Sequence, residues 1–483
     1  MDTKKQMFTK KCARFSAHSR RVRSAGDFCT IGNEVPDRTK KALLGLVIPL
    51  VLEQILGLTV GMADSVMVSS AGEAAVSGVS LVDSINILLI NLFCCLSTGG
   101  AVMAAHRLGE KREDAAQRTA DQLLVCVTGI ACLVMVFSLA ANRWLLQSVF
   151  GNVEAAVMKN AVIYFYLTAL SFPFLAVYNA SAALSRAMGD SKITMKISVL
   201  MNLVNIAGNA LLILVFGIGV YGVALSTLAS RVLGASIMYK IMRNENRQLH
   251  YSRRIVLRTD RSVLSGILKV GIPTGMDSCI FQVGKILVQS LIAGLGTTAI
   301  AANAIVGVVA GVAVIPASAM GVAMITVVGQ ALGAGEVEQA KTYVKKLMGY
   351  SYLFMVLLNG VIILFSAQIA GFYQVSEETI RLASKVIIFH SLCAMLLWPT
   401  AFSLPNALRA AMDANYTMIV SVASMWICRI GCSYLFVKEL HMGLLGIWAA
   451  MGVDWVVRSA CFIHRIKSGR WLGNGNMTER AET

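Results

Sequence analysis

Long apolar stretches alternate with short polar connections along this chain of 483 residues. Each stretch has about 20 residues or more, enough for a helix to cross a hydrocarbon core roughly 30 Å thick. The pattern therefore predicts an all-α integral membrane protein with twelve transmembrane helices. The predicted spans are residues 43–68, 79–105, 120–140, 160–184, 194–215, 219–241, 264–292, 299–330, 347–367, 382–408, 415–437 and 443–464.

The composition agrees with a membrane protein. Hydrophobic residues make up 56% of the chain and charged residues 14%, whereas a soluble domain has roughly 45–50% and 25%. The mean hydropathy is +0.68. The net charge of +17 would favour nucleic-acid binding in a soluble protein. Here we interpret it as a topology signal, because of where the basic residues lie.

Lysine and arginine gather in alternate connections. They occur before the first span, between spans two and three, between spans four and five, and in the central stretch 243–262. Several intervening connections, such as 69–78, 215–220, 293–298 and 368–380, contain none. Basic residues mark cytoplasmic connections. We therefore expect a multi-pass protein of the cell membrane with both termini in the cytoplasm, and no nucleic-acid partner.

The chain matches itself at one fixed offset, which places Pro49 on Pro273 within the strings "LVIPLVLEQ" and "VGIPTGMDS". We call this spacing the repeat offset. Further matches at the repeat offset are Leu108 and Gly109 with Leu332 and Gly333, Leu184 and Met188 with Leu408 and Met412, Ile206 with Ile430, and Gly222 with Gly446. Each copy holds six predicted spans. Two such copies keep the same orientation and are related by an axis along the membrane normal.

The repeat divides the chain into two lobes. We expect an N-lobe over residues 41–242 and a C-lobe over 263–465, joined by a cytoplasmic linker at 243–262. Residues 1–40 are basic and lack the apolar core of a signal peptide, so we expect a disordered cytoplasmic tail. Residues 466–483 are expected to form a second cytoplasmic tail. A cavity between two such lobes is what alternating access requires.

Four prolines inside predicted spans are hinge candidates: Pro49, Pro173, Pro273 and Pro399. A proline inside a helix removes a backbone hydrogen bond and favours a kink. Such a kink either allows movement or shapes static packing, and both interpretations remain open.

Polar residues on three spans lie at a similar depth. Asp64 is near the outer end of the first span, Asn205 and Asn209 are on the fifth, and Thr227 is on the sixth. With a rise of about 1.5 Å per residue, their depths agree within about one helical turn. These oxygens could hold Na⁺, or Asp64 could carry a proton. The alternative is that the amides and the hydroxyl only join helices by hydrogen bonds.

Five further charged residues within spans are candidates for a substrate cavity. Glu53 and Asp277 occupy equivalent positions, four residues after Pro49 and Pro273, and could instead cap backbone groups freed by the prolines. The others are Asp83, Lys285 and Arg429. An ionised side chain at the bilayer centre costs at least roughly 2.5–3.5 kcal/mol, so each needs a partner or a function. Lys285 and Arg429 could neutralise Asp277 or contact an anionic part of a substrate.

No pattern in the sequence points to an enzyme. It shows no metal-binding motif, no nucleophile–base pair and no phosphate-binding glycine loop. We expect no catalytic residue, no cofactor, and no metal beyond a possible Na⁺ at Asp64. The predicted class is a transporter rather than an enzyme.

The chain resembles the multidrug and toxic compound extrusion (MATE) transporters over nearly all of residues 41–465. The resemblance is carried by the strings "IPLVLEQILGLTVGMADSVMVSSAGEAAVSGVSLV" and "NLVNIAGNALLILVFGIGVYGVALST", and by the loops "HRLGEKREDA" and "QALGAGEVEQA". It implies a two-lobed secondary active antiporter that rocks between two states and exports organic cations and drugs in exchange for H⁺ or Na⁺. It also implies a small-molecule organic cation as partner, and we expect a monomer in the bilayer.

The resemblance also assigns residues. Asp64 matches the family's first-span carboxylate, Asn205 the asparagine of the cation site, and Thr227 the threonine of the sixth span. The chain departs from the family at Asn209, where one branch has an aspartate. A second branch has acids in spans 7 and 10, whereas here the span-10 position is neutral and Asp277 lies one turn early. Coupling is therefore expected in the N-lobe.

One related branch offers an alternative function. Its members are flippases for lipid-linked saccharides with similar architecture and, typically, a cavity rich in basic residues. Lys285 and Arg429 keep this alternative open.

Overall fold

The computed structural model describes residues 36–151, 153–252 and 260–472. Most of the predicted N-terminal tail, residues 253–259 of the linker and residues 473–483 of the second tail lie outside the described residues. The first half of the chain forms helices α2 (Pro36–Ser69), α3 (Glu73–Gly109), α4 (Glu113–Ala140), α5 (Asn142–Phe150), α6 (Ala155–Leu170), α7 (Phe172–Ala187), α8 (Ser191–Asn209) and α9 (Gly219–Met242).

The second half repeats this order with more breaks. Its helices are α10 (Arg261–Ala293), α11 (Thr297–Ala313), α12 (Ile315–Gly333), α13 (Val337–Leu364), α14 (Ser366–Gly371), α15 (Glu377–Trp398), α16 (Leu404–Ala410), α17 (Ala414–Ser424), α18 (Cys432–Lys438) and α19 (Gly443–Lys467). π-Helical segments, residues 399–403 and 425–431, join α15 to α16 and α17 to α18, and a third, 210–215, extends α8. The starts of α3 and α11, α4 and α13, α5 and α14, and α9 and α19 are each separated by the repeat offset.

The predicted number of spans is confirmed, although several boundaries were wrong. In the described chain, eleven helices are long and apolar enough to cross a membrane, and the bent pair α6–α7 makes a twelfth span. The first helix begins at Pro36, so residues 36–40 are helical rather than part of a disordered tail. Proline suits a first helical turn because its missing N–H would have no partner there.

Two predicted spans are interrupted. The fourth bends by 46° between α6 and α7, where Pro173 follows Ser171. The eighth, predicted as one helix over 299–330, is divided at Val314 into α11 and α12, and Pro316 follows this break. Neither proline can donate the backbone hydrogen bond that would continue the preceding helix. The short helices α5 and α14 were not predicted.

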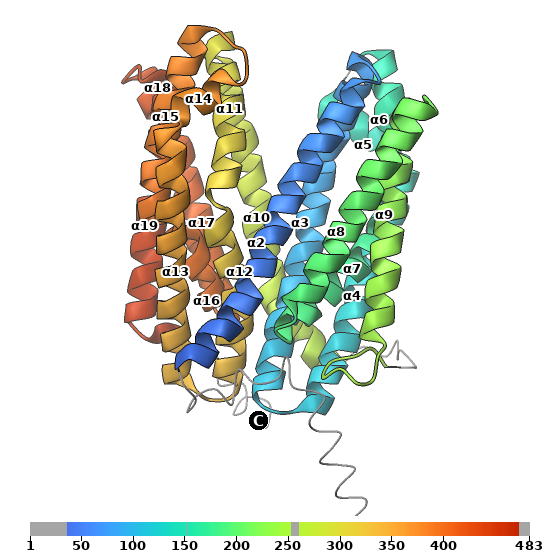
Figure 1. Ribbon diagram of the computed structural model, residues 1–483, viewed down its shortest axis with the longest axis vertical. Coiled ribbons are helices and arrows are strands. Elements are labelled where there is room, and N and C mark those ends of the chain that lie inside the picture. The colour runs from blue at the N-terminus through green and yellow to red at the C-terminus, as the bar shows by residue number, and fades with distance from the viewer. Residues whose placement is uncertain (1–35, 152, 253–259, 473–483) are drawn as a thin grey trace, which may run out of the picture.

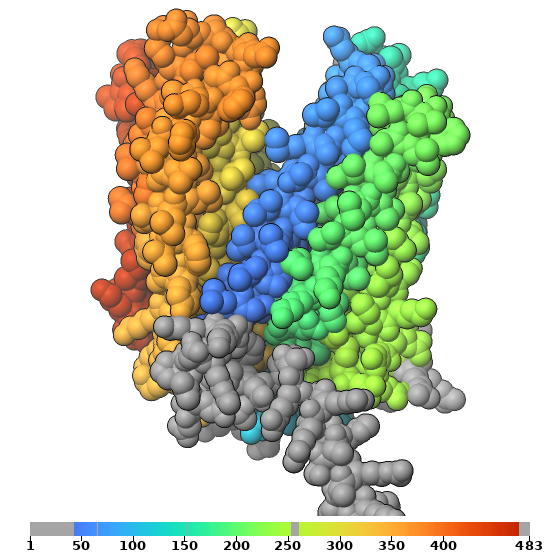
Figure 2. Space-filling view, viewed as in Figure 1, coloured from blue at the N-terminus to red at the C-terminus, as the bar shows by residue number. Residues whose placement is uncertain are grey.

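The helices form two bundles that diverge toward one end of the molecule (Figure 1). One bundle contains α3–α9, and the other contains α11–α19. The space-filling view shows a cleft between them at the diverging end (Figure 2). Helix α2 crosses from the C-lobe to the N-lobe, because Leu43, Leu46 and Leu50 pack in the same core as residues of α12. Outward faces carry exposed apolar residues such as Leu133 and Leu364, which suits contact with lipid.

The lobes meet at the opposite end through glycines at equivalent positions. A Cβ atom on Gly109 would lie 2.1 Å from the backbone oxygen of Gln330, and one on Gly333 would lie 2.1 Å from that of His106. Along α3, a Cβ on Gly99 would lie 2.3 Å from the oxygen of Ile267 in α10. The absence of side chains lets α3 approach α10 and α12 backbone to backbone.

Side chains reinforce this closed end in a pseudo-symmetric manner. His106 and Gln330 are equivalent positions, separated by the repeat offset. The ring Nε2–H of His106 donates to the carbonyl of Ala410 at 2.6 Å, and the amide of Gln330 donates to the carbonyl of Ala187 at 2.6 Å. Both acceptors are on the last turn of a helix, where carbonyls lack intrahelical donors. The two hydrogen bonds therefore tie each lobe to the other.

Candidate ion and substrate sites

Asp64, Asn209, Asn205 and Thr227 form one hydrogen-bonded chain in the N-lobe. The Asn209 amide donates to an Asp64 carboxylate oxygen at 2.6 Å and lies 3.5 Å from Oδ1 of Asn205. The Asn205 amide in turn donates to the Thr227 hydroxyl at 3.3 Å. The structure thus brings together all four residues that the sequence placed at one depth.

The chain contains an acceptor without a donor. Oδ1 of Asn209 is buried and has no hydrogen-bond partner among the described residues. Buried polar atoms are nearly always satisfied, so such an oxygen needs an explanation. Beside a carboxylate, a second amide oxygen and a hydroxyl, this oxygen completes a set of ligands that a hard cation or a protonated group would satisfy.

Asp83 lies beside this site rather than in a separate cavity. Its carboxylate accepts from the Tyr164 hydroxyl at 3.2 Å and from the Asn86 amide at 3.4 Å. Asp83 is also within electrostatic range of Asp64. The two carboxylates therefore belong to one acidic region of the N-lobe.

Arg231 of α9 is the cation of this region. It lies within electrostatic range of both Asp64 and Asp83, and it donates to the Ser171 hydroxyl at 2.6 Å, at the break between α6 and α7. Sequence reasoning missed Arg231, although an arginine inside the predicted span 219–241 was a sufficient signal. Tyr164 gave no such signal, because a tyrosine in an apolar helix is common.

Glu53 and Asp277 each form an ion pair with an arginine from the end of the fourth or tenth span. Arg186 lies 3.2 Å from the Glu53 carboxylate, which also accepts from the Thr194 hydroxyl. Arg409 lies 2.7 Å from the Asp277 carboxylate. These pairs occupy nearly equivalent places in the two copies. Capping of the backbone freed by the prolines is thus not what satisfies either carboxylate.

Glu53 and Arg186 line a cavity of about 340 Å³ at the junction of the lobes. Its walls come from α2, α3 and α7, and Val322, Ile325 and Thr326 of α12 complete it from the C-lobe. Thr326 donates to the carbonyl of Arg186 at 2.9 Å, which joins α12 to α7 beside this cavity.

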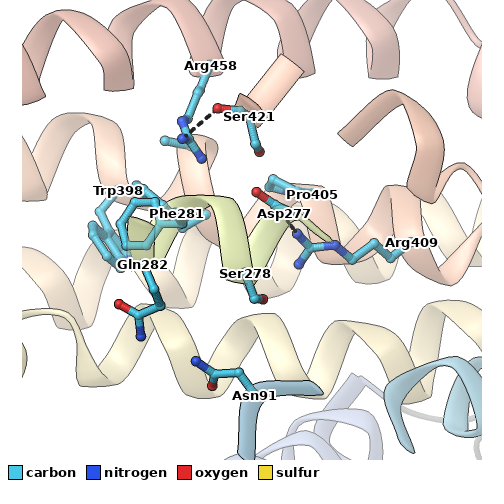
Figure 3. A pocket seen from close by; sticks show the side chains of 12 residues that line it. Asn91, Asp277, Ser278, Phe281, Gln282, Trp398, Pro405, Arg409, Ser421 and Arg458 are labelled. Atoms are coloured by element: carbon cyan, nitrogen blue, oxygen red, sulfur yellow. Dashed lines mark hydrogen bonds and ion pairs between the residues drawn. The ribbon is translucent and has the colours of Figure 1, made fainter. Parts of the chain in front are cut away.

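A second cavity of about 270 Å³ is lined by C-lobe residues and by Asn91 of α3 (Figure 3). Asp277 and Arg409 face each other on one side, and Phe281 and Trp398 form an aromatic wall. Arg458 donates to the backbone oxygen of Ser421 at 3.0 Å. It also bonds to Asp454 at 2.8 Å. Each arginine of this cavity therefore has an acidic partner.

Lys285 and Arg429 do not neutralise Asp277, because Arg409 does. Both line a separate pocket of about 140 Å³ between α10, α11 and α19. The guanidinium of Arg429 lies 5.3 Å from the centre of the Phe281 ring. Of the two roles suggested by the sequence for Lys285 and Arg429, neutralising Asp277 is therefore excluded. Contact with an anionic part of a substrate stays a prediction.

The hinge candidates occupy distinct positions. Pro49 and Pro273 lie inside α2 and α10. Pro173 is the second residue of α7, next to the 46° bend, and Pro399 begins a π-helical segment in the tenth span. Within the described residues there is no cluster of three or more histidine, cysteine, aspartate or glutamate side chains that could hold a metal ion.

The fold defines a class before any relative is considered. Two pseudo-symmetric bundles of six spans, a cleft between them and buried charges in each bundle are the features of a membrane transporter.

Comparison with known proteins specifies the family. The MatE family model matches this chain twice, over residues 49–211 and 273–435, so the chain belongs to the MATE transporters. The start and the end of the second match are displaced from those of the first by the repeat offset, which confirms the internal repeat.

Individual relatives span nearly the whole chain. It is 28% identical over 448 residues to "Probable multidrug resistance protein NorM" of Thermotoga maritima, covering 91% of this chain and 94% of that protein. It is 27% identical over 442 residues to "Uncharacterized transporter YisQ" of Bacillus subtilis, covering 90% and 95%. Among solved structures, "Outward-facing conformation of a multidrug resistance MATE family transporter of the MOP superfamily" superposes with a TM-score of 0.84 at 20% identity, covering 89% and 96%.

Proposed function

We propose that this protein is a secondary active antiporter that exports organic cations in exchange for H⁺ or Na⁺. The observation that carries the proposal is the hydrogen-bonded chain from Asp64 through Asn209 and Asn205 to Thr227. It offers one carboxylate and several neutral oxygens on three helices, and one of these oxygens is buried without a donor in the described part of the chain. The family and its multidrug relatives support the substrate class.

Asp64 couples the two movements in this proposal. With the carboxylate charged, the acidic region attracts a cationic substrate. Binding of the coupling ion at Asp64 neutralises the carboxylate and removes that attraction, so substrate and ion bind in alternation. Arg231, bonded to Ser171 at the bend of the fourth span, connects the charge of this site to the position of α7.

Rocking of the lobes supplies alternating access. The backbone contacts at Gly109 and Gly333 and the hydrogen bonds of His106 and Gln330 close one end, while the cleft opens at the other (Figure 2). For the opposite end to open, these contacts must separate. Pro49 and Pro273 are suited to act as hinges, because they lie inside α2 and α10, and each of these helices packs against both lobes.

Charge distribution supports an orientation. The closed end carries the basic connections around Lys111 and Arg112, and also the loop after α9. By the positive-inside tendency this end faces the cytoplasm, both termini lie there, and the cleft opens outward.

The test is accumulation of a fluorescent organic cation in cells that lack their own exporters. Expression of the wild type should lower accumulation, and Asp64→Asn should restore it at an equal amount of membrane protein. Equal export by the two proteins would refute the role of Asp64.

A lipid-linked saccharide flippase is the second candidate. It is favoured by Lys285 and Arg429, which have no acidic partner within ion-pair distance in the described residues. Flipping of a fluorescent lipid-linked saccharide in vesicles, without export of organic cations, would select this function.

A further inference from the structure

The C-lobe pocket that contains Lys285 and Arg429 is the structural counterpart of the N-lobe cation site. The repeat offset relates the two family-model matches to each other and the start of α9 to the start of α19. At this offset, the pocket residues Val288, Gly307, Arg429 and Met451 occupy the positions of Asp64, Asp83, Asn205 and Thr227. Equivalent backbone positions therefore line both sites, with different chemistry.

The residues at these equivalent positions give the two sites opposite charge. Both carboxylates of the N-lobe site are absent from its counterpart, where a guanidinium replaces the Asn205 amide. Lys285, one turn before Val288 on α10, adds an ammonium group to the same pocket. The N-lobe site is acidic and its counterpart is basic.

Neither Lys285 nor Arg429 forms an ion pair in the described chain. Lys285 forms no hydrogen bond or ion pair there, and Arg429 donates only to the thioether sulfur of Met451 at 3.2 Å. Two acids of the C-lobe pair with other arginines, Asp277 with Arg409 and Asp454 with Arg458. Asp454 also lies within electrostatic range of Arg429, without an ion-pair contact between them in the described residues. In addition, Nε of Arg429 is buried and has no acceptor among the residues that the structure describes.

An anionic ligand would offset the repulsion between these two positive charges. Lys285 is exposed and Arg429 is half-buried. Two like charges that line one pocket of a transmembrane lobe repel each other, and an oxyanion between them would offset this repulsion. A carboxylate or a phosphate presents several acceptors to the ammonium and the guanidinium together.

The aromatic side chains beside the basic pocket indicate which kind of group the oxyanion would be attached to. Phe281 lies one turn before Lys285, and its ring is 5.3 Å from the Arg429 guanidinium. The same ring lines the aromatic cavity of about 270 Å³ and packs edge-on against Phe402. The basic pocket, at about 140 Å³, has room for an ionic group, and the aromatic wall beside it suits an attached ring.

We propose that Lys285 and Arg429 form a binding site for the oxyanion group of an aromatic organic substrate. This inference deepens the proposed export function and rests on it, because it adds anion-bearing aromatic molecules, including zwitterions, to the substrates. The acidic N-lobe site and the basic C-lobe site then recognise opposite charges.

The test uses three probes that share one ring and differ in charge. Binding of 2-naphthoate, neutral 2-naphthamide and cationic 2-naphthylmethylammonium is measured on the purified full-length protein in detergent. The wild type should bind 2-naphthoate at least tenfold more tightly than 2-naphthamide. Lys285→Gln and Arg429→Gln should each remove that preference, while Lys285→Arg and Arg429→Lys, which keep the charge, should retain most of it.

Lys269→Gln is the matched control, because Lys269 is on the same helix and lines a different pocket. It should leave the preference unchanged. Two further probes identify the source of the oxyanion: 2-naphthyl phosphate represents a soluble phosphate, and farnesyl diphosphate represents a lipid headgroup. A preference for the lipid over both naphthyl anions, lost in Lys285→Gln, would overturn the aromatic substrate class in favour of a lipid.

Equal binding of 2-naphthoate and 2-naphthamide by the wild type would overturn the inference. So would a preference that survives in both glutamine variants. Export of a fluorescent cation, measured in parallel, separates this failure from that of the proposed function. Lys285→Gln should keep cation export, whereas Asp64→Asn should lose it and still prefer 2-naphthoate.

Discussion

Each lobe has an ion pair at a nearly equivalent place, but the lobes differ at the position of Asp64. Glu53 pairs with Arg186 in the N-lobe, and Asp277 pairs with Arg409 at the nearly equivalent place in the C-lobe. Farther along the same two helices, Asp64 corresponds to Val288. The ion pairs belong to the architecture that both copies retain. Asp64 distinguishes the N-lobe, which therefore has the chemistry to bind a coupling ion.

The largest expected effect on export follows from removing the Asp64 carboxylate, which distinguishes the N-lobe. Asp64→Asn should reduce export of a fluorescent cation to background, because the site would lose the carboxylate that accepts from the Asn209 amide. Val288→Asn is the control, since it places the same side chain at the equivalent position of the C-lobe. It should leave cation export within about twofold of wild type. Similar losses in both variants would show that the lobes do not differ in this role.

The next largest effect concerns the close backbone contacts that join the lobes at the closed end. Gly109→Leu should separate the lobes there, because even a Cβ atom would lie 2.1 Å from the oxygen of Gln330. Spin labels at Lys111 and Gly335, two residues beyond Gly109 and Gly333, should report a longer distance, and export should fall about tenfold or more. Gly129→Leu is the control, because nothing lies within 4 Å of its Cβ position. An unchanged distance in Gly109→Leu would contradict the backbone crossing.

A smaller effect is expected within the N-lobe site. Asn209→Ala removes the amide that donates to Asp64 and the oxygen that lacks a donor. The concentration of coupling ion needed for half-maximal transport should rise about tenfold, since a hydrogen bond to a charged group contributes about 1.5–3 kcal/mol. Ser433→Ala, the equivalent C-lobe change, should leave that concentration unaltered. The prediction fails if both variants behave alike.

The smallest effect tests the pseudo-symmetric hydrogen bonds. Gln330→Leu removes the donor to Ala187, and a neutral hydrogen bond contributes about 1 kcal/mol. The population with the end near Gly333 open should rise about fivefold, as measured by the same spin labels. His106→Phe should act in the same direction. Opposite shifts in the two variants would show that the closed end is not symmetric.

Much of the fold could be predicted from the sequence. Hydrophobic runs and the repeat offset predicted twelve spans and two copies because both depend on local composition and repetition. The kink that Pro173 was expected to favour lies at the 46° bend between α6 and α7. The division of the eighth span at Val314 was not predicted, since a hydropathy window averages over prolines such as Pro316. The start of α2 at Pro36 was missed because its first turn is polar.

The candidate site could be predicted in part. Depth along the helices was sufficient to group Asp64 with Asn205, Asn209 and Thr227. Polar residues at one level on packed helices can lie within hydrogen-bonding distance of one another. The partners of Glu53 and Asp277 could not be predicted. Arg186 lies in the connection between spans four and five, whose basic residues had been interpreted as a topology signal, and Arg409 lies just beyond the predicted tenth span.

One measurement tests most directly whether Asp64 couples ion entry to export. Purified protein is placed in vesicles, and movement of a fluorescent organic cation is followed under an imposed Na⁺ gradient and, separately, under a pH gradient. In the wild type at least one gradient should drive the organic cation against its own gradient, and Asp64→Asn should abolish this movement. Equal gradient-driven transport by Asp64→Asn and wild type would contradict the proposed coupling site.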